Sequence, residues 1–379
     1  MDKKSLSERD ICTKFITPAI VEAGWDRNTQ IREEVSFTAG KVIVRGKLVS
    51  RGKQKRADYI LYYKNNIPIA IIEAKDNKHS VGAGIQQGID YAETLDIPYV
   101  FSSNGDAFLF HDRTVELGKK EIELPLNKFP SPQELWNKYK KYKQIEDAEV
   151  EAVYTQNYHA DASGKEPRYY QRIAINRAVE AIAKGQDRTL LVMATGTGKT
   201  YTAFQIVYRL LKAGLKKKVL YLADRNILVD QSIQQDFAPL EKTIHKINFA
   251  KDDPVTITSH EVYFSLYQQL AGNNLQDDAG IGGGDDAVIV EVVAQDAALA
   301  LGTHGDLGLQ SVGLVADEPV GDDGLGQQGA GEGVGLVLVG HVGELEGEGV
   351  DALLGIVITE LHLGTALGSG GVAQVGLSG

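Results

Sequence analysis

The feature that most constrains the fold is a glycine-containing junction between an apolar strand and an amphipathic helix. The junction reads Met193-Ala-Thr-Gly-Thr-Gly-Lys-Thr200. Residues 189–193 before it predict a buried strand, and residues 219–223 predict a second one. The segment 199–213 between them predicts a helix whose apolar stripe consists of Ala203, Ile206, Val207, Leu210 and Leu211. Strands that alternate with helices in this way predict a parallel sheet covered by helices.

The same junction has the composition of a phosphate-binding loop. Gly196, Thr197 and Gly198 can wrap closely around phosphates and present their N–H groups at the start of a helix. Lys199 is expected to reach the β- and γ-phosphates of ATP, and Thr200 is expected to hold Mg²⁺. Met193 stands where the general pattern has its first glycine. A glycine-rich turn with a surface lysine is therefore the alternative interpretation.

An acidic pair is predicted on two neighbouring strands nearer the N-terminus. Asp58 lies in an alternating segment, and Glu73 lies near the end of the apolar segment 67–74. If Asn65-Asn66 forms a two-residue hairpin turn, the strand register places Asp58 directly opposite Glu73. Pro68 is a point at which this register could loosen.

Two carboxylates opposed on one face of a sheet repel each other, so positive charge is expected between them. Lys75 lies two residues after Glu73 and therefore projects from the same face. A Mg²⁺ ion held by Asp58, Glu73 and water would remove the repulsion. Lys75 would then stabilise charge on a phosphate or orient the attacking water, which gives hydrolytic chemistry. The alternative is a solvated charge cluster.

Further residues around this pair favour a nucleic-acid substrate. Gln87 and Tyr91 are four residues apart in the predicted helix 80–95 and so share one face. A run free of acidic residues leads into Asp58, and its basic residues are Arg45, Lys47, Arg51, Lys53, Lys55 and Arg56. Such a run suits a phosphate backbone, although it is equally typical of a solvated edge strand. We expect Arg45, Lys47, Arg51 and Lys53 to contact DNA.

These motifs resemble those of two known families, and the two sets follow each other along the chain. Asp58, Glu73 and Lys75 resemble the PD-(D/E)xK nuclease motif, and Gln87 with Tyr91 resembles the Gln-x-x-x-Tyr motif that accompanies it in one family. The phosphate-binding loop resembles motif I of superfamily 2 helicases and translocases. Within that resemblance, Gln171 of Tyr169-Tyr170-Gln171 corresponds to a residue that reads adenine, and Arg225 to one near the nucleic-acid backbone. An exposed N-terminal helical turn is the alternative for Gln171.

Together the motifs resemble the restriction (R, HsdR) subunit of type I restriction-modification enzymes. The resemblance implies an ATP-driven translocase of double-stranded DNA with a Mg²⁺-dependent endonuclease. It also implies methyltransferase (M) and specificity (S) subunits as partners. The alternative is a helicase-like nucleic-acid-binding fragment in which the Asp58 cluster is only a charged surface.

The composition changes abruptly after Asn274. All 40 Lys and Arg and every aromatic residue precede this point, so the net charge of −11 describes neither part of the chain. The remainder is rich in Gly, Ala, Val, Asp and Glu, the residues whose codons begin with G, which indicates a wrong-frame translation. Later motor elements are not recognised there, so ATP is expected to bind weakly without turnover.

The predicted fold is α/β throughout the first 274 residues. We expect a PD-(D/E)xK nuclease domain over 1–145, a linker over 146–167, and a truncated RecA-like lobe over 168–274. The segment 275–379 is expected to lack a defined fold. One cysteine, a charged N-terminus and the lack of a long apolar run indicate a cytoplasmic protein without a membrane span.

Overall fold

The computed structural model forms two compact units, both of which are discontinuous in sequence. The described residues are 2–38, 42–45, 48–51, 54–160, 164–186, 188–193, 197–223, 226–248, 251–252, 259–266, 287–293, 332–340 and 353–362. The first unit combines Met1–Gly185 with Thr202–Leu215, and the second combines Gln186–Tyr201 with Lys216–Gly379. The first unit therefore extends well past the domain boundary expected at residue 145.

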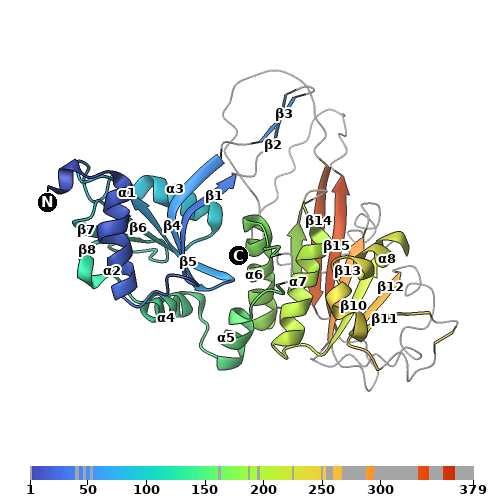
Figure 1. Ribbon diagram of the computed structural model, residues 1–379. Coiled ribbons are helices and arrows are strands. Elements are labelled where there is room, and N and C mark those ends of the chain that lie inside the picture. The colour runs from blue at the N-terminus through green and yellow to red at the C-terminus, as the bar shows by residue number, and fades with distance from the viewer. Residues whose placement is uncertain are drawn as a thin grey trace. The chain divides into compact units, whose positions relative to one another are not determined.

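The first unit is built on a six-stranded mixed sheet (Figure 1). Its order is β1-β4-β5-β6-β7-β8. The only parallel pair within this sheet is β5 with β6. The strands are β1 (Ile31–Thr38), β4 (Gln54–Lys64), β5 (Ile67–Ala74), β6 (Tyr99–Ser103), β7 (Ala107–Asp112) and β8 (Glu121–Pro125). A separate antiparallel pair consists of β2 (Val42–Arg45) and β3 (Leu48–Arg51).

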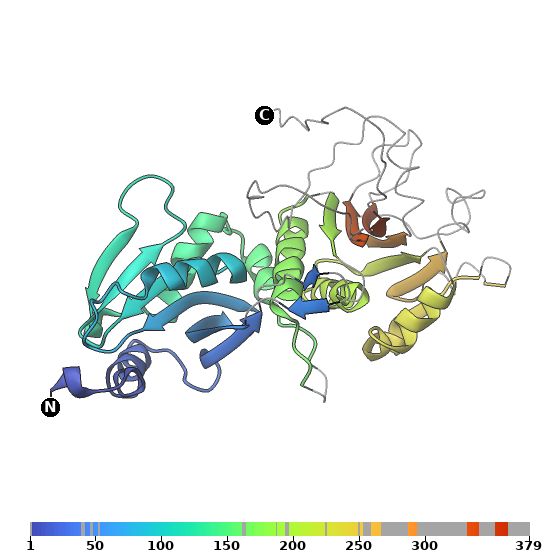
Figure 2. The same cartoon turned by 90° about the horizontal axis from the view of Figure 1, so that it is seen from above.

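Helices cover both faces of this sheet, which is seen from above in Figure 2. The larger core joins one face to the N-terminal helical segment and to two later helices, through residues such as Ile20, Trp136 and Tyr154. The smaller core joins the other face to α3, through Ala92 and Leu95. The helices are α1 (Glu8–Ile11), α2 (Thr17–Glu22), α3 (Ile85–Leu95), α4 (Pro132–Lys143), α5 (Ala148–Thr155) and α6 (Tyr169–Ala183). Burial on both faces explains why β5 is almost wholly apolar.

The predicted hairpin between β4 and β5 is confirmed. Lys64 pairs with Ile67 across the turn, and Tyr59 pairs with Ile72 near the other end. Extending this register by one residue brings Asp58 opposite Glu73. The ladder is irregular where Tyr62 pairs with Pro68, since proline has no N–H to donate, but it returns to register beyond that point.

Several helical segments have boundaries with a local cause. A π-helical segment, Cys12–Ile16, lies between α1 and α2. The expected linker contains α5, which Asp147 caps by accepting from the N–H groups of Glu149 and Val150. In α4, Ser131 and Glu134 form a reciprocal capping box. Short polar segments of this kind begin helices through caps rather than through periodicity.

The second unit contains a seven-stranded sheet in the order β11-β12-β10-β13-β15-β14-β9. Its strands are β9 (Arg188–Val192), β10 (Lys218–Ala223), β11 (Ile244–Lys246), β12 (Val262–Leu266), β13 (Ala287–Val293), β14 (Glu332–Gly340) and β15 (Leu353–His362). The remaining helices are α7 (Lys199–Lys212), which the two units share, and α8 (Asn226–Gln234). The pairs on both sides of β10 are parallel, as expected. Strand β9 instead pairs antiparallel with β14, so the sheet is mixed.

The segment 275–379 contributes three of these strands. β13, β14 and β15 are rich in Val, Leu and Ile, which favour strands, and here the structure differs from the expectation of no defined fold. The residues between these strands, and the start of the segment at 275–286, lie outside the described residues. Of the helices that the structure describes, none has both the length and the apolar character needed to cross a bilayer.

Candidate functional site

The acidic pair lies at one end of the β4–β5 hairpin, beneath α3. Oδ2 of Asp58 accepts a hydrogen bond from the backbone N–H of Ala74 at 2.8 Å. The side chain of Glu73 is fully buried. Its Oε2 accepts from Nε2 of Gln87 at 2.7 Å, whereas its Oε1 has no hydrogen-bond partner within the described part of the chain. A buried acceptor without a partner is costly, so the site is suited to a proton or a cation at this oxygen.

The electrostatics of the pair support the same conclusion. Burial, and then the nearby carboxylate of Asp58, raise the pKa of Glu73 to about 8, while Lys75 opposes the shift. Burial also raises the pKa of Asp58, against the hydrogen bond from Ala74 and the charge of Lys75. Both carboxyl groups therefore ionise less readily than free ones, and a cation bound at the pair would favour their charged forms.

Lys75 lies beside the pair and contacts a residue that the sequence reasoning missed. Its ammonium donates to the carbonyl of Ala74 at 2.8 Å and lies 4.0 Å from Oε2 of Glu8. Burial raises the pKa of Glu8, with Lys75 opposing the shift and Asp58 adding to it. Glu8 opens α1, whose capping box uses Ser7 and Asp10. No spacing signal connects this helix start with strands fifty residues later, so only the fold reveals the contact.

Gln87 and Tyr91 lie together on α3, as their spacing predicts. Nε2 of Gln87 donates to Glu73 and also reaches the hydroxyl of Tyr91 at 3.2 Å. The Tyr91 ring packs edge-on against Phe37, and the ammonium of Lys55 lies 5.4 Å from the centre of the Tyr91 ring. This chain of contacts holds the carboxylate of Glu73 in one orientation and joins it to the end of the basic run.

Two glycines allow α3 to lie close to Glu73. A Cβ atom on Gly84 would lie 2.9 Å from Cβ of Glu73. A Cβ atom on Gly88 would lie 2.6 Å from Cγ1 of Val100 and 3.4 Å from Cγ of Glu73. Close packing thus requires glycine at both positions. The helix predicted over 80–95 begins only at Ile85.

We expect Gly88→Ala to destabilise the chain. Overpacking of this kind costs about 1–3 kcal/mol, and the better helix propensity of alanine offsets about 1 kcal/mol. A net loss of up to about 2 kcal/mol in the free energy of unfolding should appear in urea titrations followed by circular dichroism. Glu93→Ala, at an exposed position of the same helix, is the matched control. Equal stability of the two variants would contradict the packing argument.

The predicted DNA-contacting residues are only partly described. Arg45 ends β2 and Arg51 ends β3, but their side chains lie outside the described residues, as do Lys47 and Lys53 entirely. Of the same run, Arg56 forms an ion pair with Glu34 at 3.3 Å. The DNA contacts of this run therefore stay a prediction.

The phosphate-binding loop lies in the second unit, between β9 and α7. Gly196 lies outside the described residues. Gly198 has a φ of +82°, a left-handed conformation that favours glycine. Lys199 and Thr200 begin α7, and the side chain of Thr200 hydrogen-bonds the hydroxyl of Tyr221 on β10. The strand before a phosphate loop and the helix after it are thus both present.

The structure describes only one of the two further residues that the helicase resemblance predicts, Gln171 and Arg225. Gln171 is buried at the start of α6, where its Oε1 accepts from the backbone N–H of Arg168 at 2.9 Å. It thus forms part of a helix cap and is not an exposed residue of that turn. Arg225 lies outside the described residues.

The donor set of the acidic pair fits a magnesium ion. Mg²⁺ keeps several of its waters and is commonly bound by one or two carboxylates, which Asp58 and Glu73 supply. Among the described residues, no three His, Cys, Asp or Glu side chains are gathered as metal ligands. The unpaired oxygen of Glu73 suits a hard cation that completes its coordination with water.

The chain as described combines a mixed α/β unit bearing a carboxylate–lysine cluster with a sheet bearing a phosphate-loop sequence. Residues 28–130 match the family model for the type I restriction enzyme R protein N terminus. Residues 164–291 match the model for the type III restriction enzyme res subunit, a helicase-like domain. The chain therefore belongs to the family of type I restriction enzyme R subunits.

Individual relatives support this assignment. The chain is 52% identical over 273 residues to the type I restriction enzyme EcoAI endonuclease subunit of Escherichia coli, an alignment that covers 72% of this chain and 33% of that protein. It is 26% identical to the EcoKI endonuclease subunit of Escherichia coli K12, over 60% of this chain and 23% of that protein. The chain thus spans about a third or less of the length of these relatives.

A solved structure has the same fold over most of the chain. It is a fragment assigned to an HsdR subunit of a type I restriction enzyme from Vibrio vulnificus YJ016. The two chains are 36% identical, with a TM-score of 0.60 over 76% of this chain and 51% of that chain.

Proposed function

We propose that this chain supplies Mg²⁺-dependent endonucleolytic cleavage of double-stranded DNA in a type I restriction system, and that it binds ATP at the loop 196–200. The proposal places Asp58, Glu73 and Lys75 at the cleavage site. It also takes the M and S subunits of the same system as partners, with ATP-driven DNA translocation as the activity of the whole enzyme. The EcoAI and EcoKI relatives, both named as endonuclease subunits, support it.

The observation that carries the proposal is the state of Glu73. Glu73 is a fully buried carboxyl next to a second carboxyl, and one of its oxygens has no hydrogen-bond partner among the described residues, an arrangement that is unfavourable for stability. Sites of this kind are characteristic of function, because a bound cation relieves the strain that the fold imposes. In a solvated charge cluster the carboxylates would instead be exposed and paired.

The residues of the site divide the work of phosphodiester hydrolysis. Asp58 and Glu73 would hold Mg²⁺, which supplies a polarised water and charge stabilisation when bound. Gln87 orients Glu73 through its hydrogen bond, and the N–H of Ala74 orients Asp58. Lys75 offers its ammonium to the phosphate oxygens, and Glu8 holds that ammonium at the mouth of the site.

A plasmid-nicking assay on the purified chain tests the proposal. With Mg²⁺ we expect conversion of supercoiled plasmid to the open-circular form, and with excess EDTA we expect none. Binding of the plasmid without conversion would favour the alternative, a helicase-like fragment that binds nucleic acid but has no nuclease activity. A gel-shift measurement in EDTA, run beside the assay, separates the two outcomes.

A further inference from the structure

A buried polar network joins α7 to the turn of the β4–β5 hairpin, and it lies wholly within the first unit. Its centre is Arg209 of α7, which is 1% exposed. Burial lowers the pKa of this guanidinium, which shows how unfavourable its environment is for charge. Burying a charged residue of this kind lowers stability, because the other buried residues of the helix are largely apolar.

The partners of Arg209 explain how the charge is tolerated. Its Nη2 donates to the carbonyl oxygen of Tyr154 at 2.7 Å, and the Tyr158 ring lies 5.5 Å from its Cζ. The carbonyl of Tyr154 belongs to the last turn of α5, where the helix dipole favours a cation. The side chain amide of Asn66 donates to the same carbonyl at 3.0 Å. Arg209 and the hairpin turn therefore cap one helix end together.

Asn176 of α6 connects Arg209 to the hairpin turn directly. Its Nδ2 donates to the backbone carbonyl of Asn66 at 2.7 Å, and its Oδ1 accepts from Nη1 of Arg209 at 2.8 Å. If the side-chain amide of Asn176 were flipped, its Nδ2 donor would face the Nη1 donor of Arg209. Only the orientation seen here therefore satisfies both neighbours. A shift of Arg209 along the axis of α7 would break the bond to Asn176 or move the turn with it.

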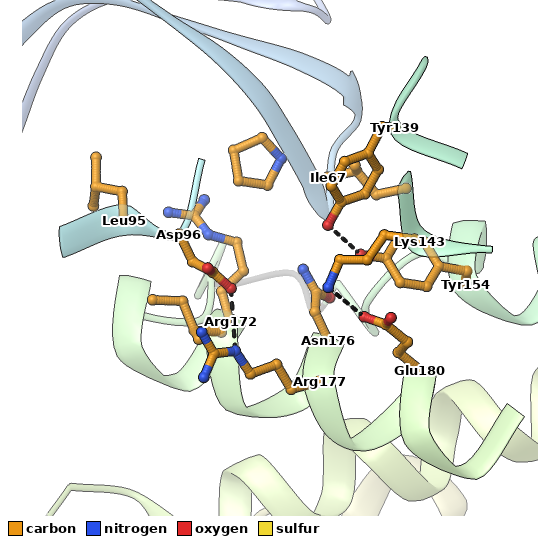
Figure 3. A pocket seen from close by; sticks show the side chains of 12 residues that line it. Ile67, Leu95, Asp96, Tyr139, Lys143, Tyr154, Arg172, Asn176, Arg177 and Glu180 are labelled. Atoms are coloured by element: carbon orange, nitrogen blue, oxygen red, sulfur yellow. Dashed lines mark hydrogen bonds and ion pairs between the residues drawn. The ribbon is translucent and has the colours of Figure 1, made fainter. Parts of the chain in front are cut away.

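Other contacts fix α6 against the same end of the first unit (Figure 3). Nη1 of Arg172 donates to the hydroxyl of Tyr62 on β4 at 2.7 Å. The Arg177–Asp96 and Lys143–Glu180 ion pairs lie around the pocket that contains Asn176. The turn is therefore held by a packed polar network, in which Oδ1 of Asn66 and Nε of Arg209 have no hydrogen-bond partner among the described residues. Networks of this kind respond to a change in one member as a whole.

The buried network connects two elements, α7 and β5, that belong to different predicted sites. Helix α7 begins at Lys199 of the phosphate-binding loop, less than three turns before Arg209. Strand β5 begins after Asn66 and carries Glu73 near its far end. We propose that Arg209 is a positioning residue through which ATP at the loop alters the nuclease hairpin. The inference rests on the proposed function, because it requires that the loop binds ATP.

Amide hydrogen exchange on the full chain tests the inference. With Mg²⁺ and saturating ATP, we expect wild-type exchange to change in residues 57–74. Arg209→Lys keeps the charge but loses the planar fork that spans Asn176 and α5, so this ATP-induced change should disappear. ATP affinity, and nicking without nucleotide, should be retained. Lys212→Met, at the exposed end of the same helix, should behave as wild type.

A second variant covers the case in which Arg209→Lys does not fold. Asn176→Ala leaves the contacts of Arg209 with α5 in place and should also remove the ATP-induced change. A purely structural role for Arg209 predicts faster exchange to the same extent with and without ATP, and that result would overturn the inference. So would wild-type protein that binds ATP with no change in the hairpin. Failure of wild type to bind ATP in a separate titration would overturn both the inference and the proposed ATP site.

Discussion

Glu73→Ala and Lys75→Ala are each expected to reduce Mg²⁺-dependent nicking by about a hundredfold or more, the loss typical of removing one preorganised group that stabilises developing charge. Glu73 is the buried carboxylate with the unpartnered oxygen, and Lys75 is the cation beside it. The rate of loss of supercoiled plasmid, at saturating Mg²⁺, is the measurement. Lys78→Ala, at an exposed lysine three residues further on, is the control for a general loss of positive charge.

Glu73→Gln separates catalysis from folding. The pKa of Glu73 is about 8 in the folded chain, above its ordinary value of 4.5. The folded state therefore holds a proton that the unfolded state releases, and metal-free stability falls as pH rises from about 4.5 to about 8. Glutamine keeps the shape without this cost. Glu73→Gln should thus be inactive and, at pH 8 in EDTA, no less stable than wild type. A marked loss of stability would argue that Glu73 serves the fold.

Lys199→Ala is expected to weaken ATP binding about 10- to 150-fold, because a hydrogen bond to a charged group contributes about 1.5–3 kcal/mol. Isothermal titration with ATP and Mg²⁺ measures the affinity directly. Lys212→Ala removes a lysine from the other end of the same helix and should leave the affinity unchanged. Nicking without nucleotide should survive in both variants. If Lys199→Ala bound ATP as wild type does, the junction would be a glycine-rich turn and not a phosphate site.

Local sequence signals predicted the hairpin well. Two consecutive asparagines between apolar segments specify a tight turn, and a turn of known length fixes the register of both strands. That is why the opposition of Asp58 and Glu73 could be anticipated, even though Pro68 disturbs the ladder between them. The helical spacing of Gln87 and Tyr91 worked for the same reason, since both residues lie on one short element.

Contacts between distant segments left no such signal. Glu8 reaches Lys75 only because α1 packs against the end of the sheet, and nothing near Glu8 in sequence indicates it. Arg209 lies outside the apolar stripe that the sequence defines on α7, so periodicity alone gives no reason to bury it, whereas the structure buries it. The antiparallel pairing of β9 with β14 joins segments more than a hundred residues apart. Such pairings depend on the whole fold and not on any local pattern.

The discontinuous first unit limits how this protein can change by recombination. The sheet that bears the proposed nuclease site packs with helices that come later in the chain, and one of them begins with the proposed ATP-binding sequence. A crossover after residue 145 would separate the side-chain amide of Asn66 from its native acceptor, the carbonyl of Tyr154, and the carbonyl of Asn66 from its native donor, Asn176. Exchange of the nuclease module among relatives should therefore succeed only when the segment through residue 215 is inherited with it. The two proposed activities would then be inherited as one unit, and not merely as neighbours in one gene.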